Sequence, residues 1–285
     1  MNIIASDGRN PLAHTNAGPE QVVEAVERVG RLPAIPTHDW CEQAAAVAGS
    51  SLFVPPASGV VAVGVGSLQG DNIDRLESVG VHGVGSQSGE TDEIRTRLRG
   101  IGFFPAGVNT DKLKSDPTVA VAPVAQIREA SSWKSSAIGR LLTSRGLTAV
   151  LIGAGLIADT DPSRVLWVLG AVEDSGVYVG DMVFAMVILL AMLRRARLAL
   201  SGVGRNSSDW ISPREQEILK HLVLGKSVRQ IAEETGRSAH TIHDHVKSLH
   251  RKLNATSRGE LIARALGHVT QGARIREASR KIRHT

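Results

Sequence analysis

Five polar side chains between residues 240 and 251 recur at a spacing that places them on one side of a helix. Each of His240, His243, Asp244, Lys247 and Arg251 lies three or four residues from another of the five, so their side chains share a face. Such groups donate and accept hydrogen bonds. They suit the edges of nucleic-acid bases, where a lysine can pair with guanine O6 and N7 and an aspartate can accept from cytosine N4.

The other side of this helix is predicted to be buried. Ile242, Val246, Leu249 and Leu253 form one apolar stripe at helical spacing. Polar residues near the edges of this apolar stripe are suited to contact DNA phosphates. Such contacts give affinity and register but carry little sequence information. The predicted phosphate contacts are Thr241, His240, Arg251, Lys252 and Arg258.

Four helix starts between residues 212 and 260 position this segment. Ser212, Ser227 and Ser257 each precede a Glu or Gln by three residues, the capping-box pattern, and Ser238 is a further N-cap. The second and third helices are joined through Gly236-Arg237-Ser238, which predicts a helix-turn-helix.

Residues 211–266 resemble the LuxR/FixJ-type DNA-binding domain. The matching motifs are Pro213-Arg214-Glu215, Ile231-Ala232, Thr241-Ile242, Lys252-Leu253 and Arg258-Gly259-Glu260. The resemblance implies an all-α four-helix module with base contacts at His243, Asp244 and Lys247. It also implies double-stranded DNA, a second copy of the chain and RNA polymerase as partners, and a dimer surface on the fourth helix.

The charge distribution agrees with a nucleic-acid partner. Residues 209–285 carry 15 Lys and Arg and 8 Asp and Glu, a net charge of +7, whereas residues 1–208 carry 18 and 20, a net charge of −2. A basic module on a near-neutral body is typical of proteins that bind nucleic acid.

The composition argues against several other classes of protein, among them disulfide-bonded, zinc-binding, secreted and membrane-spanning proteins. A single cysteine, Cys41, allows no intramolecular disulfide and no zinc site with two or more cysteine ligands. His243 and His245 point to nearly opposite sides of a helix, so we expect no metal site there. The N-terminus lacks a secretory-signal pattern, and the apolar run Met182–Leu193 is too short to span a bilayer. We expect a cytoplasmic protein without a cofactor.

The N-terminal two-thirds alternates helical and strand patterns. Helices are predicted at 19–29, 37–48, 90–99, 135–144 and 181–200, and strands at 59–66, 118–127, 147–152 and 164–172. This order predicts an α+β domain with an antiparallel sheet and flanking helices, and it resembles a GAF- or PAS-related sensor domain that takes a small-molecule or protein effector. Trp133 and Trp167 are predicted as core residues. The glycine pairs 64/66, 83/85 and 153/155 lack a nucleotide-binding pattern and are predicted as turns.

The sequence therefore predicts a sensor-like domain over 1–200, a linker over 201–209, a helix-turn-helix domain over 210–270 and a basic tail over 271–285. A transcription regulator is the favoured function. A sigma-like initiation factor would require an aromatic-rich promoter-melting region, which residues 1–208 lack. An enzyme with a DNA-targeting domain would require a nucleophile–base pair, a carboxylate pair or a metal cluster, and we expect no catalytic residues.

Overall fold

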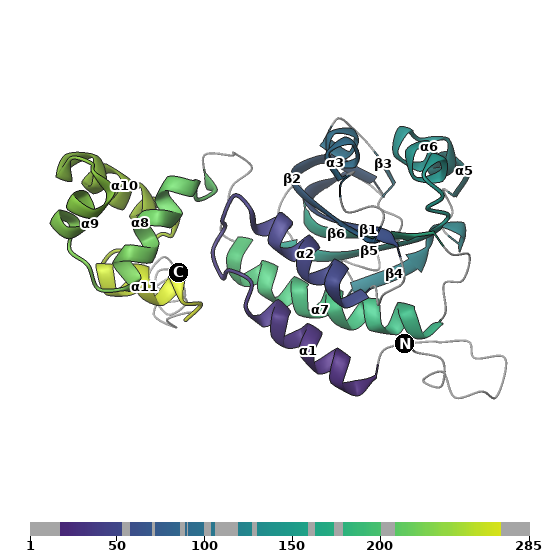
Figure 1. Ribbon diagram of the computed structural model, residues 1–285, viewed down its shortest axis with the longest axis horizontal. Coiled ribbons are helices and arrows are strands. Elements are labelled where there is room, and N and C mark those ends of the chain that lie inside the picture. The colour runs from purple at the N-terminus through teal and green to yellow at the C-terminus, as the bar shows by residue number, and fades with distance from the viewer. Residues whose placement is uncertain are drawn as a thin grey trace, which may run out of the picture. The chain divides into compact units, whose positions relative to one another are not determined.

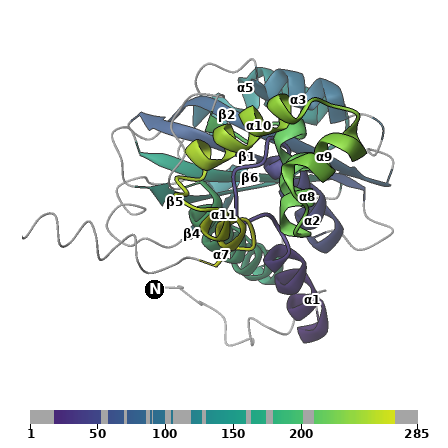
Figure 2. The same ribbon diagram turned by 90° about the vertical axis from the view of Figure 1, so that its left-hand side faces the viewer.

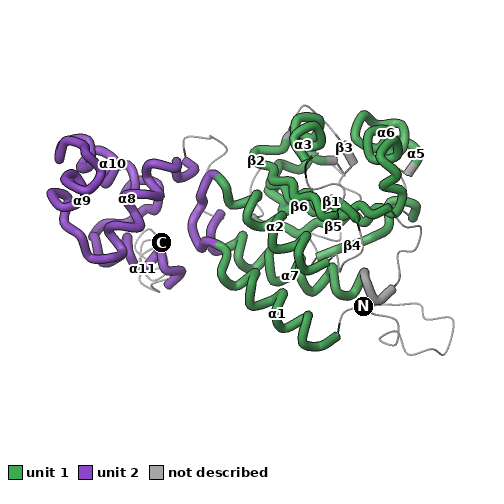
Figure 3. Tube along the Cα trace, viewed as in Figure 1, with its two compact units in different colours: residues 1–32, 39–197 green, residues 33–38, 198–285 purple. Residues whose placement is uncertain are grey.

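The chain divides into two compact units, each with its own hydrophobic core. Unit 1 comprises residues 1–32 and 39–197, and unit 2 comprises residues 33–38 and 198–285 (Figure 3). The computed structural model describes residues 18–52, 58–69, 72–85, 89, 91–99, 104–105, 119–126, 130–158, 163–173, 179–200 and 209–268. The predicted linker, apart from Asp209, and the predicted tail lie outside these residues.

Unit 1 is built on a six-stranded sheet with the strand order β3-β2-β1-β6-β5-β4. All neighbouring strands are antiparallel, which confirms the predicted α+β class. The strands are β1 (Gly59–Gln69), β2 (Asn72–Val84), β3 (Phe104–Pro105), β4 (Val119–Pro123), β5 (Ala149–Ala158) and β6 (Arg164–Val172). Valines of β1 are buried on both faces of the sheet, so helices must cover both.

Helices lie on the two sides of this sheet (Figure 1). On one side are α1 (Pro19–Gly30), α2 (Trp40–Leu52) and α7 (Val179–Leu200), and on the other are α3 (Thr91–Arg99), α5 (Ala130–Ser135) and α6 (Ala137–Ser144). A 3₁₀ turn, η2 (Val124–Gln126), follows β4, where a longer strand was predicted. Among the described helices, none combines the length and apolarity that crossing a membrane requires.

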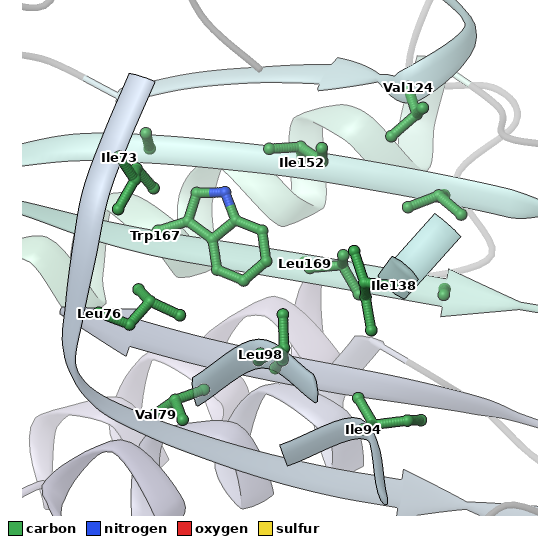
Figure 4. Packing of buried hydrophobic residues seen from close by; sticks show 14 of the residues in the cluster. Ile73, Leu76, Val79, Ile94, Leu98, Val124, Ile138, Ile152, Trp167 and Leu169 are labelled. Atoms are coloured by element: carbon green, nitrogen blue, oxygen red, sulfur yellow. The ribbon is translucent and has the colours of Figure 1, made fainter. Parts of the chain in front are cut away.

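The larger core lies between the sheet and α3, α5 and α6. Trp167 of β6 packs there with Ile138 of α6 and Leu98 of α3 (Figure 4). Trp133 and Trp167 are 2% and 0% exposed, which confirms both as core residues.

The glycine prediction was wrong, because all three pairs include residues within strands. Gly153 and Gly155 lie in β5, where an added Cβ would come within 2.7 Å of Leu189 and Leu193 of α7. Gly80 of β2 is tighter still, since a Cβ there would overlap the backbone of Cys41 in α2. These glycines let helices approach the sheet closely.

The strand β2 was missed in the sequence, where residues 67–117 were predicted to contain only a helix at 90–99. Charged residues interrupt its apolar alternation, and two register shifts disturb its pairing with β1. One of these charges, Glu77, is buried beside Arg164 of β6, with 2.6 Å between carboxylate and guanidinium. The hydroxyl of Ser67 in β1 donates to the same carboxylate over 3.3 Å. A paired charge can thus occupy a buried strand.

Unit 2 contains four helices, among which α10 packs against α8, α9 and α11 (Figure 2). Its helices are α8 (Pro213–Val223), α9 (Val228–Thr235), α10 (Ala239–Lys252) and α11 (Arg258–Ala265). Ser212, Ser227, Ser238 and Ser257 accept hydrogen bonds from backbone N–H groups of the helices they precede, as predicted. At the fourth start, Glu260 accepts from the N–H of Thr256 instead of completing a capping box.

A buried ion pair fixes α10 to the start of α8. The Lys252 ammonium lies 2.8 Å from the carboxylate of Glu215 and 2.8 Å from the carbonyl oxygen of Trp210. The N–H of Ser212 donates over 2.8 Å to the same oxygen as Lys252, Oε2 of Glu215. The hydroxyl of Ser248 in α10 donates over 2.7 Å to the other carboxylate oxygen, Oε1. Burial alone would raise the pKa of Glu215, but these hydrogen bonds outweigh it and lower the pKa from 4.5 to about 2.

Removing this charge should destabilise unit 2. Glu215→Gln is expected to lower its free energy of unfolding by about 3 kcal/mol at pH 7, because the buried ammonium of Lys252 loses its counter-ion. Since the folded pKa lies below 4.5, the carboxylate stabilises the native state above that pH, and this contribution is lost as the pH falls through about 2. The difference in free energy of unfolding between the wild type and Glu215→Gln should therefore shrink as the pH falls from 4.5 to about 2. Native-state hydrogen exchange of α8 and α10 amides measures both effects.

Glu217→Gln is the matched control on the same helix. Glu217 pairs with Arg214 over 3.0 Å, but their side chains are 43% and 60% exposed, so the expected loss is below about 0.5 kcal/mol. Equal losses in the two variants would mean that the buried network contributes no more than a surface pair.

Candidate nucleic-acid interface

The predicted helix-turn-helix is formed by α9 and α10. Gly236 ends α9 in the left-handed conformation with φ 65°, which favours glycine. Two residues later the hydroxyl of Ser238 accepts from the N–H of Thr241 over 3.1 Å and starts α10. The tight turn and the cap together set the direction in which α10 leaves α9.

The apolar stripe of α10 faces the core of unit 2, as predicted. Ile242 and Leu249 are fully buried, Leu253 at the helix end is 7% exposed, and Val246 packs against the same cluster. Because this side is buried, the opposite side of α10 is exposed. It carries five exposed side chains: His240, His243, Asp244, Lys247 and Arg251. We refer to these five residues as the α10 stripe.

Asp244 lies between two cationic or potentially cationic partners on the α10 stripe. One carboxylate oxygen is 3.5 Å from Nε2 of His240, and the other is 3.9 Å from Nζ of Lys247. All three side chains are more than half exposed, so these contacts are weak in water. They hold a mixed donor and acceptor surface on one helix face, with little net charge.

Three of the predicted phosphate contacts lie at exposed or half-exposed positions of α10: His240, Thr241 and Arg251. Thr241 is half-buried, and its hydroxyl lies 2.8 Å from that of Ser238 within the N-cap. Arg251 is exposed, and its guanidinium is 3.4 Å from the hydroxyl of Ser248.

Lys252 lies in a buried ion pair, and its predicted phosphate contact stays a prediction. Its side chain is only 10% exposed, and its ammonium is held by Glu215 and Trp210. A phosphate contact would require this buried pair to break. The sequence pattern did not show this, because residues 215 and 252 are too far apart for helical periodicity to relate them.

Arg258 has a structural role that the sequence did not reveal. Its guanidinium donates to the carbonyl oxygens of Leu222 and Lys226, over 3.3 and 2.8 Å, after the last turns of α8. The carbonyl oxygen of Leu222 also accepts from the N–H of Gly225, and Lys226 lies in the turn after α8. Arg258 therefore ties the start of α11 to the C-terminal end of α8 and to the turn that follows it. Its predicted phosphate contact stays a prediction.

A second cluster was also missed. Lys226, between α8 and α9, lies 2.5 Å from the carboxylate of Glu234, which also lies 3.2 Å from Nδ1 of His221. The hydrogen bond from Lys226 lowers the pKa of Glu234. This cluster ties the end of α8 to α9, and residues eight and thirteen positions apart give no local signal for it.

One histidine of α10 has a structural role at the end of the helix. Nδ1 of His250 lies 2.8 Å from the carbonyl oxygen of Ala255, in the turn after the helix. Within the described ranges, no three His, Cys, Asp or Glu residues lie where they could hold a metal ion.

Comparison with known proteins identifies the C-terminal module. Residues 209–265 match the family described as bacterial regulatory proteins, luxR family. The transcriptional regulatory protein MctR of Rhizobium johnstonii is 43% identical over 61 residues, which are 21% of this chain and 28% of that protein. The probable HTH-type transcriptional regulator GfsR of Streptomyces halstedii is 38% identical over 58 residues, 20% of this chain and 24% of that protein. The chain thus spans about a quarter of the length of these curated relatives.

Two solved structures align with most of the chain at low similarity. A crystal structure of Escherichia coli SdiA is 14% identical, with a TM-score of 0.33, over 87% of this chain and 97% of that one. A complex of SdiA with octanoyl-rac-glycerol is 13% identical, with a TM-score of 0.34, over 87% and 94%. At TM-scores this low, neither structure serves as a guide to this chain.

The family match covers the four capped helices, the turn at Gly236 and the exposed face of α10, all of which the geometry shows independently. Residues 209–265 are therefore a helix-turn-helix domain of the luxR family of bacterial regulatory proteins.

Proposed function

We propose that the protein is a sequence-specific, DNA-binding regulator of transcription that reads the major groove with α10. The observation that carries the proposal is the α10 stripe, five exposed polar side chains on the second helix of a helix-turn-helix. In such motifs the early residues of the second helix contact base edges. The family to which residues 209–265 belong supports the same function.

Each side chain of the stripe has a chemical role in this proposal. Lys247 donates to guanine O6 and N7, and Asp244 accepts from cytosine N4. His243 either donates or accepts, depending on its tautomer. His240, Thr241 and Arg251 contact phosphates and set the register of the helix.

The charge of the C-terminal part supports binding to a polyanion. Residues 209–285 carry a net charge of +7. Cations that neutralise phosphates release the counter-ions condensed on DNA, so binding should weaken steeply as salt rises. A DNA partner places the proposed activity in the cytoplasm of a bacterial cell.

Assembly and control belong to the same proposal. Two copies would present two α10 helices to half-sites one helical turn apart, about 34 Å, with α11 as the expected contact between them. The antiparallel sheet and two helical layers of unit 1 are compatible with a GAF-like sensor for a small molecule or a protein. Its signal would change DNA binding and, through it, the access of RNA polymerase to a promoter.

Lys247→Ala tests sequence reading. Sites would first be selected from random DNA by the purified full chain. The variant is expected to lose about tenfold in discrimination between a selected site and unrelated DNA, because one bidentate base contact is removed. The control is Lys220→Ala, which removes an exposed cation from α8. It should weaken the affinity for the selected site and the affinity for unrelated DNA by the same factor. Gel shifts from 50 to 200 mM salt measure the affinities. Salt-insensitive binding by the wild-type chain would overturn the proposed function.

Asp244→Asn tests the negative charge on the stripe. Removing the carboxylate beside Lys247 and His240 should raise affinity for unrelated DNA by about fivefold, equivalent to ~1 kcal/mol. It should also steepen the salt dependence by about one released counter-ion. The control is Glu233→Gln, which removes a carboxylate paired with Arg229 on α9. We expect it to cause no gain in affinity for unrelated DNA. A loss of affinity for unrelated DNA in Asp244→Asn would contradict the role assigned here.

A further inference from the structure

The DNA-binding unit contains a segment from a distant part of the sequence. Residues 33–38, Pro-Ala-Ile-Pro-Thr-His, belong to unit 2, although α1 and α2 on either side of them belong to unit 1 (Figure 3). We call this segment the α1–α2 connector. The chain therefore passes between the units at both ends of the connector as well as between residues 197 and 198.

The connector docks beside the start of α8 through backbone hydrogen bonds. The N–H of Ile211 donates to the carbonyl oxygen of Pro36 over 2.7 Å, and the N–H of His38 donates to the carbonyl oxygen of Ile211 over 3.1 Å. These bonds form a parallel β-bridge between Thr37 and Ile211. The amide nitrogen of Gln216 lies 2.9 Å from Nδ1 of His38 and adds a side-chain contact from α8.

Apolar burial accompanies these bonds. Ile35 is 7% exposed and belongs to the same core cluster as Ile218, Leu253 and Leu261 of unit 2. The hydrophobic core under α10 is thus completed by a residue that precedes it by more than 170 positions. A docked connector is part of the domain rather than a loose tether.

The docking point touches the network that fixes α10. Ile211 lies between Trp210, whose carbonyl oxygen accepts from Lys252, and Ser212, whose N–H donates to Glu215. Glu215 and Lys252 hold the end of α10 against α8. A continuous series of contacts therefore runs from the connector, through residues 210–212, to the helix that carries the α10 stripe.

One feature limits the stability of the docked state. The hydroxyl of Thr37 is buried without a hydrogen-bond partner, and the residue is only 4% exposed. Burying a hydroxyl unpaired costs free energy that the undocked connector does not incur. The free energy of docking is therefore less favourable than it would be if this hydroxyl were paired or absent.

We propose that the α1–α2 connector is a conformational clamp, whose docking on Ile211 couples the state of unit 1 to the placement of α8 and α10. A change in unit 1 that displaces α1 or α2 pulls on both ends of the connector and shifts its docking equilibrium. This inference rests on the proposed function for its effect on DNA, but docking itself can be measured without DNA.

Two substitutions should move the clamp in opposite directions. Thr37→Val removes the unpaired hydroxyl at nearly constant volume and should strengthen docking, whereas Ile35→Ala removes buried apolar contact and should weaken it. In the full chain, hydrogen exchange of the Ile211 amide should slow by about fivefold in the first variant and accelerate by at least fivefold in the second. Affinity for a selected DNA site should change at least threefold, with opposite signs in the two variants.

Val228→Ala is the control, because it removes apolar volume beside the same core from α9 without altering the connector. It should leave the relative protection of Ile211 and other α8 amides unchanged. Opposite shifts in exchange without opposite shifts in DNA affinity would overturn the clamp, as would an unchanged Ile211 amide in Thr37→Val. A wild-type chain that binds no DNA would instead overturn the proposed function, and the exchange data would still show whether the connector docks.

Discussion

The carboxylate of Glu215 in α8 accepts hydrogen bonds from α10 and from the turn that precedes α8. Lys252 and Ser248 reach it from α10, and the N–H of Ser212 reaches it from the cap. A buried charge is tolerated only when it is paired and its remaining lone pairs are satisfied. That requirement fixes the rotation of α10, because only one orientation brings positions 248 and 252 to the carboxylate. The same orientation turns His240, His243, Asp244 and Lys247 outward.

Most of unit 2 could be predicted because its signals are local. A serine cap acts within three residues, a left-handed glycine ends its own helix, and an apolar stripe repeats within one element. Those rules gave the four helices and the exposed residues of α10. They did not reveal the partners of Lys252 and Arg258, because the sequence contains no periodicity that relates α10 or α11 to α8. Long basic side chains serve equally well as phosphate ligands and as internal ion-pair partners.

Unit 1 was harder to predict because its decisive contacts are between distant strands and helices. The strand β2 carries Glu77, whose burial makes sense only when Arg164 of β6 is beside it. Gly153 and Gly155 resemble turn glycines in the sequence, yet they lie in a strand where a helix approaches the backbone. Helix α2 begins at Trp40, three residues later than predicted. Thr37 and His38 belong instead to unit 2, where Thr37 forms a β-bridge with Ile211.

The connector changes how a signal could pass between the units. A domain held by one flexible linker samples many orientations, and a change elsewhere in the chain has no direct means of selecting one. In the proposed clamp, a second attachment would act at Ile211, the residue between Trp210 and Ser212 of the α10 network. The energetic requirement is a contact near balance, so that a modest change in unit 1 can tip it. In the proposed clamp, the paired backbone bonds of Ile211 favour docking and the unsatisfied hydroxyl of Thr37 opposes it.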